Sequence, residues 1–172
     1  MINHCTPSQL LATLDDLGVV YQLHHHPPLH TVEDAIRERG DLGGSYVKNL
    51  YLKDRQGRMA LIVCLSTRSV NLQRLRLAIG FKRLSFASSE SLWADLGVQP
   101  GSVSPLALIN ASPSRLSFFA DEMLRDNPLT NFHPLTNEMT VQLKFTDWVQ
   151  LCTHWGFSPS WLNFDHLPEE TR

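Results

Sequence analysis

The chain has 172 residues, of which 42% are hydrophobic and 19% are charged. That length allows one well-buried core but not two comfortable domains, so we expect a single domain over residues 1–172. No segment approaches the roughly 20 apolar residues that a membrane-spanning helix needs, and the start is not a signal peptide. The three cysteines lack the paired spacing of a zinc site or a disulfide framework, so the sequence predicts a reducing, cytoplasmic setting, no membrane, no metal and no cofactor.

The charge is unevenly divided along the chain. Although the net charge is −2, residues 55–89 contain no acidic residue and seven basic ones: Arg55, Arg58, Arg68, Arg74, Arg76, Lys82 and Arg83. A basic surface on an otherwise acidic protein is typical of a polyanion partner that is bound in one orientation. The alternative is an ordinary solvated face that carries arginine for solubility.

The N-terminal segment predicts a helix followed by a strand. Thr6 and Gln9 have the spacing of a capping box, which predicts a helix up to residue 17 with Gly18 as its terminator. Residues 19–24 have the composition of a strand.

Three consecutive histidines, at positions 24–26, raise the possibility of a metal site with His30. Successive strand residues face opposite sides of a sheet, and no carboxylate or cysteine stands at ligand spacing, so the sequence argues against it. Thr31 and the acidic residues after it predict a second helix, which Gly40 closes.

Two strands come next, over residues 46–53 and 59–65. The second is apolar throughout, which is typical of a central strand covered on both faces. Lys48 shares the parity of apolar residues in the first strand, so it either snorkels at the end of the sheet or meets an anion in a cleft. Cys64 has no basic neighbour in its run, which favours packing over a role as nucleophile.

The basic segment continues into two short helices and a loop. Asn71 caps a helix that ends at Gly80 and exposes Arg74 and Arg76, and a further helix runs from Ser88 or Ser89 to residue 96. The loop over residues 97–105 is rich in glycine and proline. Its exposed amides suit close approach to a ligand, although hairpin connections use the same residue types.

The C-terminal half predicts two strands, a hairpin and a helix. The strands are expected over residues 106–110 and 116–120, with Asp121 at the end of the second. Period-two alternation on both sides of residues 131–137 predicts a hairpin, and Pro134 leaves His133 beside a cavity at its mouth. A structural histidine at a turn is the alternative. Thr146 is expected to cap the last helix, which carries an apolar stripe.

Several short motifs occur in a characteristic order: His26-Pro27, Thr31-Val32-Glu33, Lys48-Asn49-Leu50, Leu84-Ser85-Phe86-Ala87, Gly97-x-x-Pro100-Gly101-Ser102-Val103-Ser104-Pro105 and His133-Pro134-Leu135-Thr136-Asn137. In this order and spacing they resemble the aminoacyl-tRNA deacylases related to the editing domain of prolyl-tRNA synthetase, the YbaK-like family. The resemblance covers residues 6–157. It is strongest to the free-standing alanyl-tRNA(Pro) deacylases, and Glu138-Met139 departs from the small or hydroxyl residues that relatives carry there.

The resemblance implies an α/β (α+β) fold, with one compact domain and a mixed, strongly curved sheet flanked by helices. It also implies hydrolysis of the ester that joins a mischarged amino acid to the 3′ end of tRNA. Prolyl-tRNA synthetase is a candidate further partner, and whether the protein works alone or docked on it stays open. An aminoacyl ester is already activated, so positioning a water and stabilising the oxyanion can suffice. The sequence contains no triad signature, which fits such a mechanism.

The resemblance also suggests roles for individual residues. Lys48 is expected to hold the terminal phosphate or ribose region, and the backbone amides around Gly97, Gly101 and Ser102 to hold the carbonyl or terminal adenosine. His133 is expected to line the amino-acid pocket, so that alanine fits and proline does not. Asn49 and Asn137 are expected to be supporting amides, and Asp121 is a candidate ligand of the substrate ammonium group. The contacts to the acceptor stem are expected from Arg74, Arg76, Lys82 and Arg83.

Two other functions remain open at this point. A related deacylase for another small aminoacyl-tRNA, such as cysteinyl or seryl, would share the fold and differ around His133. A non-catalytic tRNA-binding module would bind tRNA without turnover, and loss of Lys48 would then change only the affinity.

Overall fold

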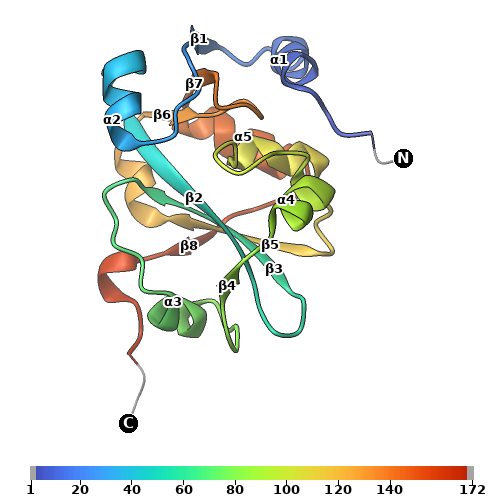
Figure 1. Ribbon diagram of the computed structural model, residues 1–172, viewed down its shortest axis with the longest axis vertical. Coiled ribbons are helices and arrows are strands. Elements are labelled where there is room, and N and C mark those ends of the chain that lie inside the picture. Colours follow the sequence, from blue (N-terminus) through green and yellow to red (C-terminus); the bar gives the residue numbers. More distant parts are fainter. Residues whose placement is uncertain (1–2, 170–172) are drawn as a thin grey trace.

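The computed structural model describes residues 3–169 of the chain. These residues form an eight-stranded sheet in the order β1-β7-β6-β2-β3-β5-β8, with β4 paired to β2 (Figure 1). The strands are β1 (Tyr21–His25), β2 (Ser45–Lys53), β3 (Met59–Leu65), β4 (Ser85–Phe86), β5 (Leu116–Asp121), β6 (Leu129–Phe132), β7 (Met139–Lys144) and β8 (Ser160–Leu162).

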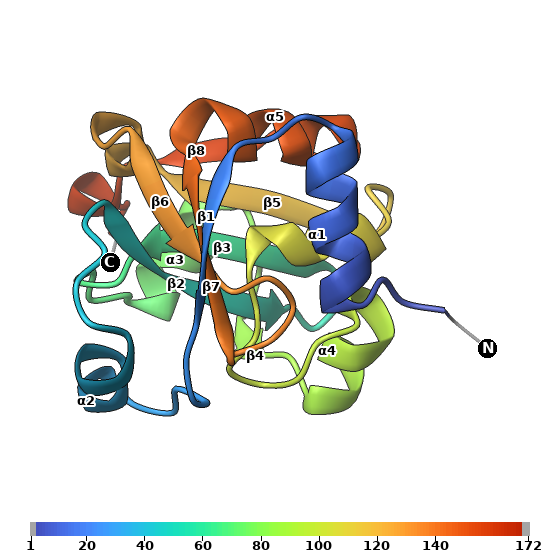
Figure 2. The same cartoon turned by 90° about the horizontal axis from the view of Figure 1, so that it is seen from above.

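Strand β2 belongs to both halves of the sheet and has both parallel and antiparallel neighbours, so the sheet is mixed. The start of β2 pairs in parallel with β6, while the rest of the strand pairs antiparallel with β3 and, at its far end, with β4. Figure 2 shows β1, β6 and β7 running at a steep angle to β3 and β5, so the sheet bends strongly along β2. The predicted fold class, a mixed and curved sheet flanked by helices, is confirmed.

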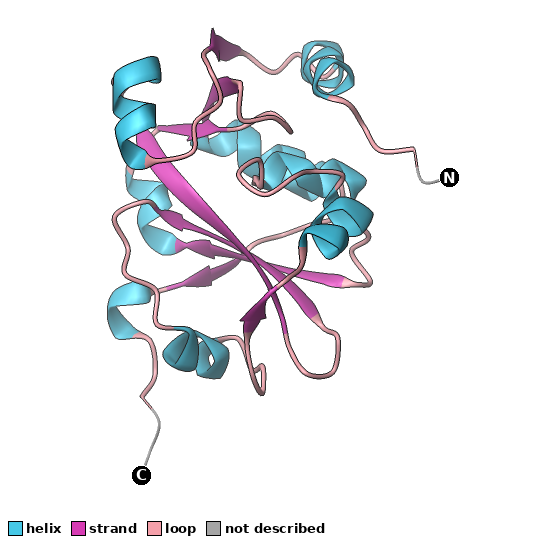
Figure 3. Cartoon of the chain, in the orientation of Figure 1, coloured by secondary structure: helices cyan, strands magenta, loops and turns pink. Residues whose placement is uncertain are grey.

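Helices lie on both sides of this sheet, as Figure 3 shows. The α-helices are α1 (Pro7–Asp16), α2 (Val32–Asp34), α3 (Leu72–Ala78), α4 (Ser89–Leu96) and α5 (Phe145–His154). A π-helix, η1 (Ala35–Arg39), continues α2, and three 3-10 helices are η2 (Pro105–Asn110), η3 (Glu122–Asp126) and η4 (Phe164–His166).

Strand β3 separates two hydrophobic cores. Leu61 and Val63 face a large core that contains residues of α1, α4, η2 and α5, while Ile62 and Cys64 face a smaller core beneath α3 and η4. The prediction that this strand is covered on both faces is therefore confirmed. Burial raises the pKa of the Cys64 thiol to about 12, which fits packing and not nucleophilic chemistry.

Most predicted element starts are confirmed by the side chains that cap them. Thr6 and Gln9 form the capping box of α1, the Asn71 side chain accepts hydrogen bonds from the first turn of α3, and the Ser88 side chain caps α4. The predicted hairpin is also confirmed, because β6 and β7 pair antiparallel from Leu129 to Phe132.

Two sequence predictions are wrong. Residues 106–110 form η2 instead of a strand, because Pro105 opens the helix and the Ser104 side chain accepts a hydrogen bond from the Leu106 amide. A short apolar run has no periodicity that separates a buried strand from a buried helix. Thr146 is not the cap of α5, which begins one residue earlier; the Thr146 hydroxyl instead donates to Asp147.

Candidate functional site

A cavity of about 850 Å³ lies where the segment of α2 and η1 approaches the start of β2. Three parts of the chain form most of its walls: the π-helix η1, the first half of β2, and the end of β6 with the turn that follows it. The segment before α2, the segment after β3 and Thr140 of β7 complete the lining. The first two of the three main parts are more than 80 residues from the third in the sequence. The parallel pairing of Ser45 and Tyr46 with Thr130 and Asn131 brings β2 and β6 together.

His133 lies on the cavity wall directly after β6. Its Nδ1 is 2.9 Å from the carbonyl oxygen of Met139, and because a carbonyl only accepts, Nδ1 must carry the hydrogen. Nε2 is then an acceptor, and the structure shows no hydrogen bond to it within residues 3–169. Burial lowers the pKa of His133, so the ring is neutral at neutral pH.

A second histidine supports this wall from behind. The His26 ring lies 6.1 Å from the His133 ring between centroids, with its Nε2 2.9 Å from the Thr140 hydroxyl and its Nδ1 2.9 Å from the Pro27 carbonyl oxygen. Thr140 itself lines the cavity. The polar wall is therefore held by contacts between β7 and the segment after β1.

Asn49 lines the cavity from β2, on the same face as Val47. Its Oδ1 is buried and has no hydrogen-bond partner within the described part of the chain. A buried amide oxygen without a partner is rare in a folded protein and requires an explanation such as an absent ligand or water.

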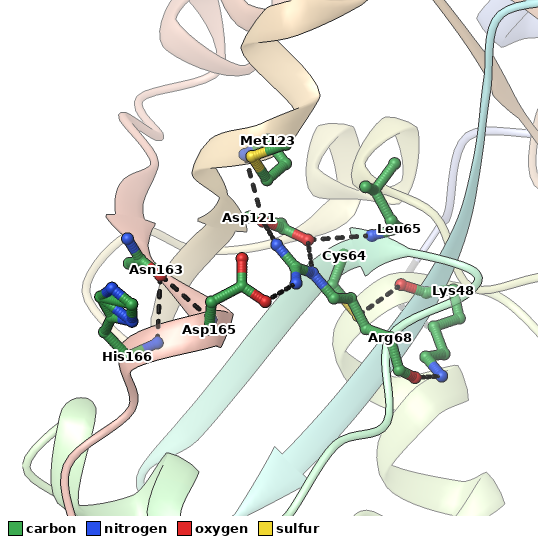
Figure 4. Close-up of polar contacts among 9 residues, drawn as sticks. All are labelled: Lys48, Cys64, Leu65, Arg68, Asp121, Met123, Asn163, Asp165 and His166. Atoms are coloured by element: carbon green, nitrogen blue, oxygen red, sulfur yellow. Dashed lines mark hydrogen bonds and ion pairs between the residues drawn. The ribbon is translucent and has the colours of Figure 1, made fainter.

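Lys48 lies on the other face of β2, because successive strand residues alternate. Its Nζ donates to the carbonyl oxygen of Arg68, as Figure 4 shows. Ser66 and Thr67, in the same segment as Arg68, line the cavity. The Lys48 charge therefore lies beside the segment that closes the cavity, while its side chain is not among the cavity-lining groups.

Asp121 is fully buried at the end of β5 and belongs to a different group of residues. It accepts hydrogen bonds from the Leu65 and Met123 amides at 3.3 and 3.1 Å. Two guanidinium nitrogens of Arg68 also donate to it, at 2.8 and 3.2 Å, while a third bonds Asp165 at 2.5 Å (Figure 4). We call Arg68, Asp121 and Asp165 the Arg68 cluster. Asp121 was a candidate to bind the ammonium group of the substrate, but it does not line the cavity.

The two glycines of the loop over residues 97–105 lie in different surroundings. Gly97 ends α4 with a φ of 65°, and an added Cβ there would lie 2.6 Å from the His4 side chain, so it packs against the N-terminal segment and not the cavity. Gly101, with a φ of 91°, faces Asn137. Ser102 is buried beside it, and its amide donates to the Gln99 carbonyl.

Asn137 does not line the cavity but contacts a residue that does. Its Nδ2 donates to the carbonyl oxygen of Leu29 at 3.5 Å, and its own carbonyl accepts from the Leu29 amide at 3.4 Å. Leu29 lines the cavity. The predicted site residue Asn137 therefore supports the segment before α2, Gly101 faces Asn137, and neither residue borders the cavity itself.

A second cleft, of about 440 Å³, is lined mainly by cations at the far end of β2. We call it the basic cleft. Its lining residues are Arg55, Gln73, Arg76, Lys82 and Arg83. Nine residues of β2, at about 3.3 Å each, separate its ends by about 26 Å. Arg74 was predicted to join these cations, but its guanidinium donates to the Leu167 and Pro168 carbonyls and so holds the C-terminal segment.

Sequence reasoning missed Arg39 and Tyr46. The Arg39 guanidinium carbon lies 4.2 Å from the centroid of the Tyr46 ring, and both residues line the cavity. Arg39 ends the π-helix, so a 3.6-residue period does not place it on the correct face. Within residues 3–169 no cluster of metal-ligating side chains occurs, and no helix there is long and apolar enough to cross a membrane.

Comparisons with known proteins identify the family of the chain. The model of the aminoacyl-tRNA editing domain matches residues 26–151. The prolyl-tRNA editing protein ProX of Acetoanaerobium sticklandii is 32% identical over 139 residues, which are 80% of this chain and 85% of that protein. Prolyl-tRNA synthetase associated domain-containing protein 1 of Xenopus laevis is 32% identical over 162 residues, or 91% of this chain and 96% of the relative.

The fold is shared as well. A solved structure described as a candidate trans-editing enzyme for prolyl tRNA synthetase has a TM-score of 0.71 and 18% identity, and the match covers 91% of this chain and 94% of that one. The match to the editing-domain family and the similarity to ProX define an aminoacyl-tRNA deacylase, an ester hydrolase that acts on mischarged tRNA. The chain belongs to the aminoacyl-tRNA editing domain family.

Proposed function

We propose that the protein removes alanine from mischarged alanyl-tRNA(Pro). The observation that carries this proposal is a cavity with two polar acceptors that lack partners within residues 3–169, Asn49 Oδ1 and His133 Nε2. The α-ammonium group of an aminoacyl ester supplies three N–H donors, which matches such acceptors. A neutral His133 accepts without repelling that cation.

The size of the cavity supports an occupant larger than the amino acid. Sites of about 300–1,000 Å³ bind ligands of drug size, so 850 Å³ suits an aminoacyl group together with the terminal adenosine. His133 and Phe132 line the cavity, and we place the side chain of the substrate's amino acid against them. We propose that this wall admits alanine and excludes the proline ring, because a rigid wall rejects a larger group more strongly than contacts select a smaller one.

The proposed chemistry is attack by a positioned water. The two buried cysteines are poor nucleophiles, since burial raises the pKa of both thiols. The ester is already activated, so the site must orient the water and stabilise the negative charge that develops on the carbonyl oxygen. We propose that Lys48 supplies positive charge at the ribose or phosphate end, with Nζ turning from the Arg68 carbonyl towards the substrate.

The test of this proposal is deacylation of alanyl-, cysteinyl-, seryl- and prolyl-tRNA(Pro) by the purified protein, beside Lys48→Ala and a chelator control. Loss of alanine alone, abolished in the variant and unaffected by chelator, is the expected result. Preferential loss of cysteine or serine would keep the chemistry and replace the substrate. An absence of turnover on all four would contradict the proposal and favour a tRNA-binding module.

We propose that the basic cleft binds the acceptor stem. Its position about 26 Å from the cavity end of β2 allows one tRNA to reach both. Arg83→Ala is expected to reduce the slope of log affinity against log salt by about 0.9 for each duplex phosphate that the variant no longer neutralises. Arg115→Ala, at an exposed arginine outside the cleft, is the matched control. Equal slopes for the two variants would exclude the cleft.

Prolyl-tRNA synthetase is the proposed protein partner. The name of the Xenopus relative associates its domain with that synthetase. Co-sedimentation of the purified protein with prolyl-tRNA synthetase, with and without tRNA, tests the interaction. Binding only when tRNA is present would show that tRNA bridges the two proteins.

A further inference from the structure

Two arginines in the helix over the cavity have different surroundings. The Arg37 side chain is 65% exposed, and its guanidinium pairs with Asp34 at 2.8 Å and Glu38 at 2.6 Å. Arg39 lies two residues further on and lines the cavity. Its Nε is buried and has no hydrogen-bond partner within residues 3–169. The same short helix therefore contains one arginine paired with two carboxylates and one whose buried Nε donor is unused.

The position of Arg39 is fixed by its stacking. Its guanidinium carbon lies 4.2 Å from the centroid of the Tyr46 ring. The Tyr46 hydroxyl is itself held, because it donates to Asp41 and accepts from the Leu42 amide. Stacking uses the flat face of a guanidinium and leaves its N–H groups free in the plane. Arg39 thus presents a rigid fork of donors at the cavity.

Burial makes this arrangement unfavourable unless an anion completes it. Partial burial lowers the pKa of Arg39, although a guanidinium stays charged at every physiological pH. Asp41 also lines the cavity, but its Oδ1 accepts from the Gly43 amide and the Tyr46 hydroxyl, and no ion pair joins it to Arg39 in the described residues. The nearby Asp41 carboxylate raises the pKa of Arg39 through its charge, but no ion pair or hydrogen bond joins the guanidinium to an anion within residues 3–169.

The substrate class identifies the missing anion. An aminoacyl ester has no free carboxylate, and the anion nearest to the ester is the phosphate on the 5′ oxygen of the terminal adenosine. A guanidinium fork matches two phosphate oxygens in a bidentate contact. We propose that Arg39, stacked on Tyr46, forms a phosphate subsite for the terminal nucleotide of the substrate. This inference rests on the proposed function; of the two positions suggested for Lys48, it assigns the phosphate to Arg39 and leaves the ribose end to Lys48.

The experiment compares two small substrates, 3′-O-alanyl-adenosine with and without a 5′-phosphate. The readout is the ratio of their kcat/KM values. The wild-type protein is expected to prefer the phosphorylated substrate by about tenfold, the factor that corresponds to about 1.4 kcal/mol. Arg39→Gln is expected to bring the ratio close to one, mainly through a higher KM for the phosphorylated substrate.

Two further variants separate the role of Arg39 from general effects. Arg39→Lys keeps a charge without the planar fork and is expected to retain part of the preference. Arg37→Gln removes a neighbouring arginine that faces away from the cavity, so its ratio should equal that of the wild type. A ratio unchanged in Arg39→Gln, even if both rates fall, would assign Arg39 a structural role and overturn the proposal.

A binding measurement keeps the inference separate from the proposed function. Calorimetry of AMP and of adenosine needs no turnover. Preference for AMP in the wild type, abolished in Arg39→Gln and kept in Arg37→Gln, would support the subsite even if no alanyl substrate is hydrolysed. Equal affinity of the wild type for AMP and adenosine would overturn it, whatever the deacylation assays show.

Discussion

The cavity, which β2 and β6 border, and the Arg68 cluster, which lies at the ends of β3 and β5, are two polar regions of one sheet, but their hydrogen bonding differs. In the Arg68 cluster, Asp121 accepts four hydrogen bonds and the Arg68 guanidinium pairs with two carboxylates. At the cavity, Asn49 Oδ1 and Arg39 Nε have no partner in residues 3–169. Buried polar groups are normally satisfied. The satisfied region therefore supports the fold, and the unsatisfied region is the one that we propose binds the substrate.

This difference explains where the sequence-based assignment of Asp121 and the structure diverge. A carboxylate that already accepts four hydrogen bonds has little capacity left for a substrate ammonium group. Lys48 of β2 contacts the Arg68 cluster, because its Nζ donates a hydrogen bond to the backbone carbonyl oxygen of Arg68. The Arg68 cluster thus anchors the segment that holds the charge next to the cavity.

The largest expected effect comes from breaking the satisfied region. Asp121→Ala leaves the Arg68 guanidinium, whose side chain is 15% exposed, without its buried partner. We expect a loss of about 3–5 kcal/mol in the free energy of unfolding. Denaturant titration measures it. Asp165→Ala is the control: its side chain is 59% exposed, and we expect a loss below about 1 kcal/mol. Similar losses for both variants would contradict the distinction.

Removing a polar group at the cavity is expected to lower deacylation activity while it leaves stability almost unchanged. Asn49→Ala deletes an oxygen without a partner in the described residues, so the free energy of unfolding is expected to change by less than about 0.5 kcal/mol. Deacylation is expected to fall, since a hydrogen bond to a charged group contributes about 1.5–3 kcal/mol. Paired measurements of stability and kcat/KM test this. A stability loss as large as that of Asp121→Ala would show that Asn49 supports the fold.

The cavity wall is expected to determine specificity. His133→Ala removes the imidazole beside the proposed amino-acid position and should increase hydrolysis of prolyl-tRNA relative to alanyl-tRNA. Because a missing methylene changes discrimination by about 1–3 kcal/mol, a shift of about tenfold or more in the ratio is reasonable. Competition assays with the two charged tRNAs measure it. An unchanged ratio would place the specificity elsewhere.

The smallest expected effect is a pH dependence of stability. Burial lowers the pKa of His133, so below the unfolded value of about 6.5 the unfolded chain binds a proton that the folded chain does not. This contribution to stability is present above about pH 6.5 and is lost as the pH falls towards the folded pKa. His133→Asn should therefore show a shallower decline in acid, whereas His154→Asn, at an exposed position, should follow the wild type.

Local signals in the sequence were sufficient for most elements. The capping box at Thr6 and Gln9, the Asn71 cap and the alternation around the β6–β7 turn act between residues close in the chain, so the helices and the hairpin were predictable. The order of the short motifs was sufficient for the family, because spacing survives substitution of single residues. His133 was placed beside a cavity for the same local reason, the proline that follows it.

Tertiary structure alone decided which polar side chains pair and which do not. The bond between Arg68 and Asp121 joins residues 53 positions apart, and Arg74 meets the C-terminal segment 93 positions away. Arg39 reaches the cavity through a π-helix that has no periodic signal. Partners of long side chains depend on which segments meet in space, and sequence spacing contains no measure of that.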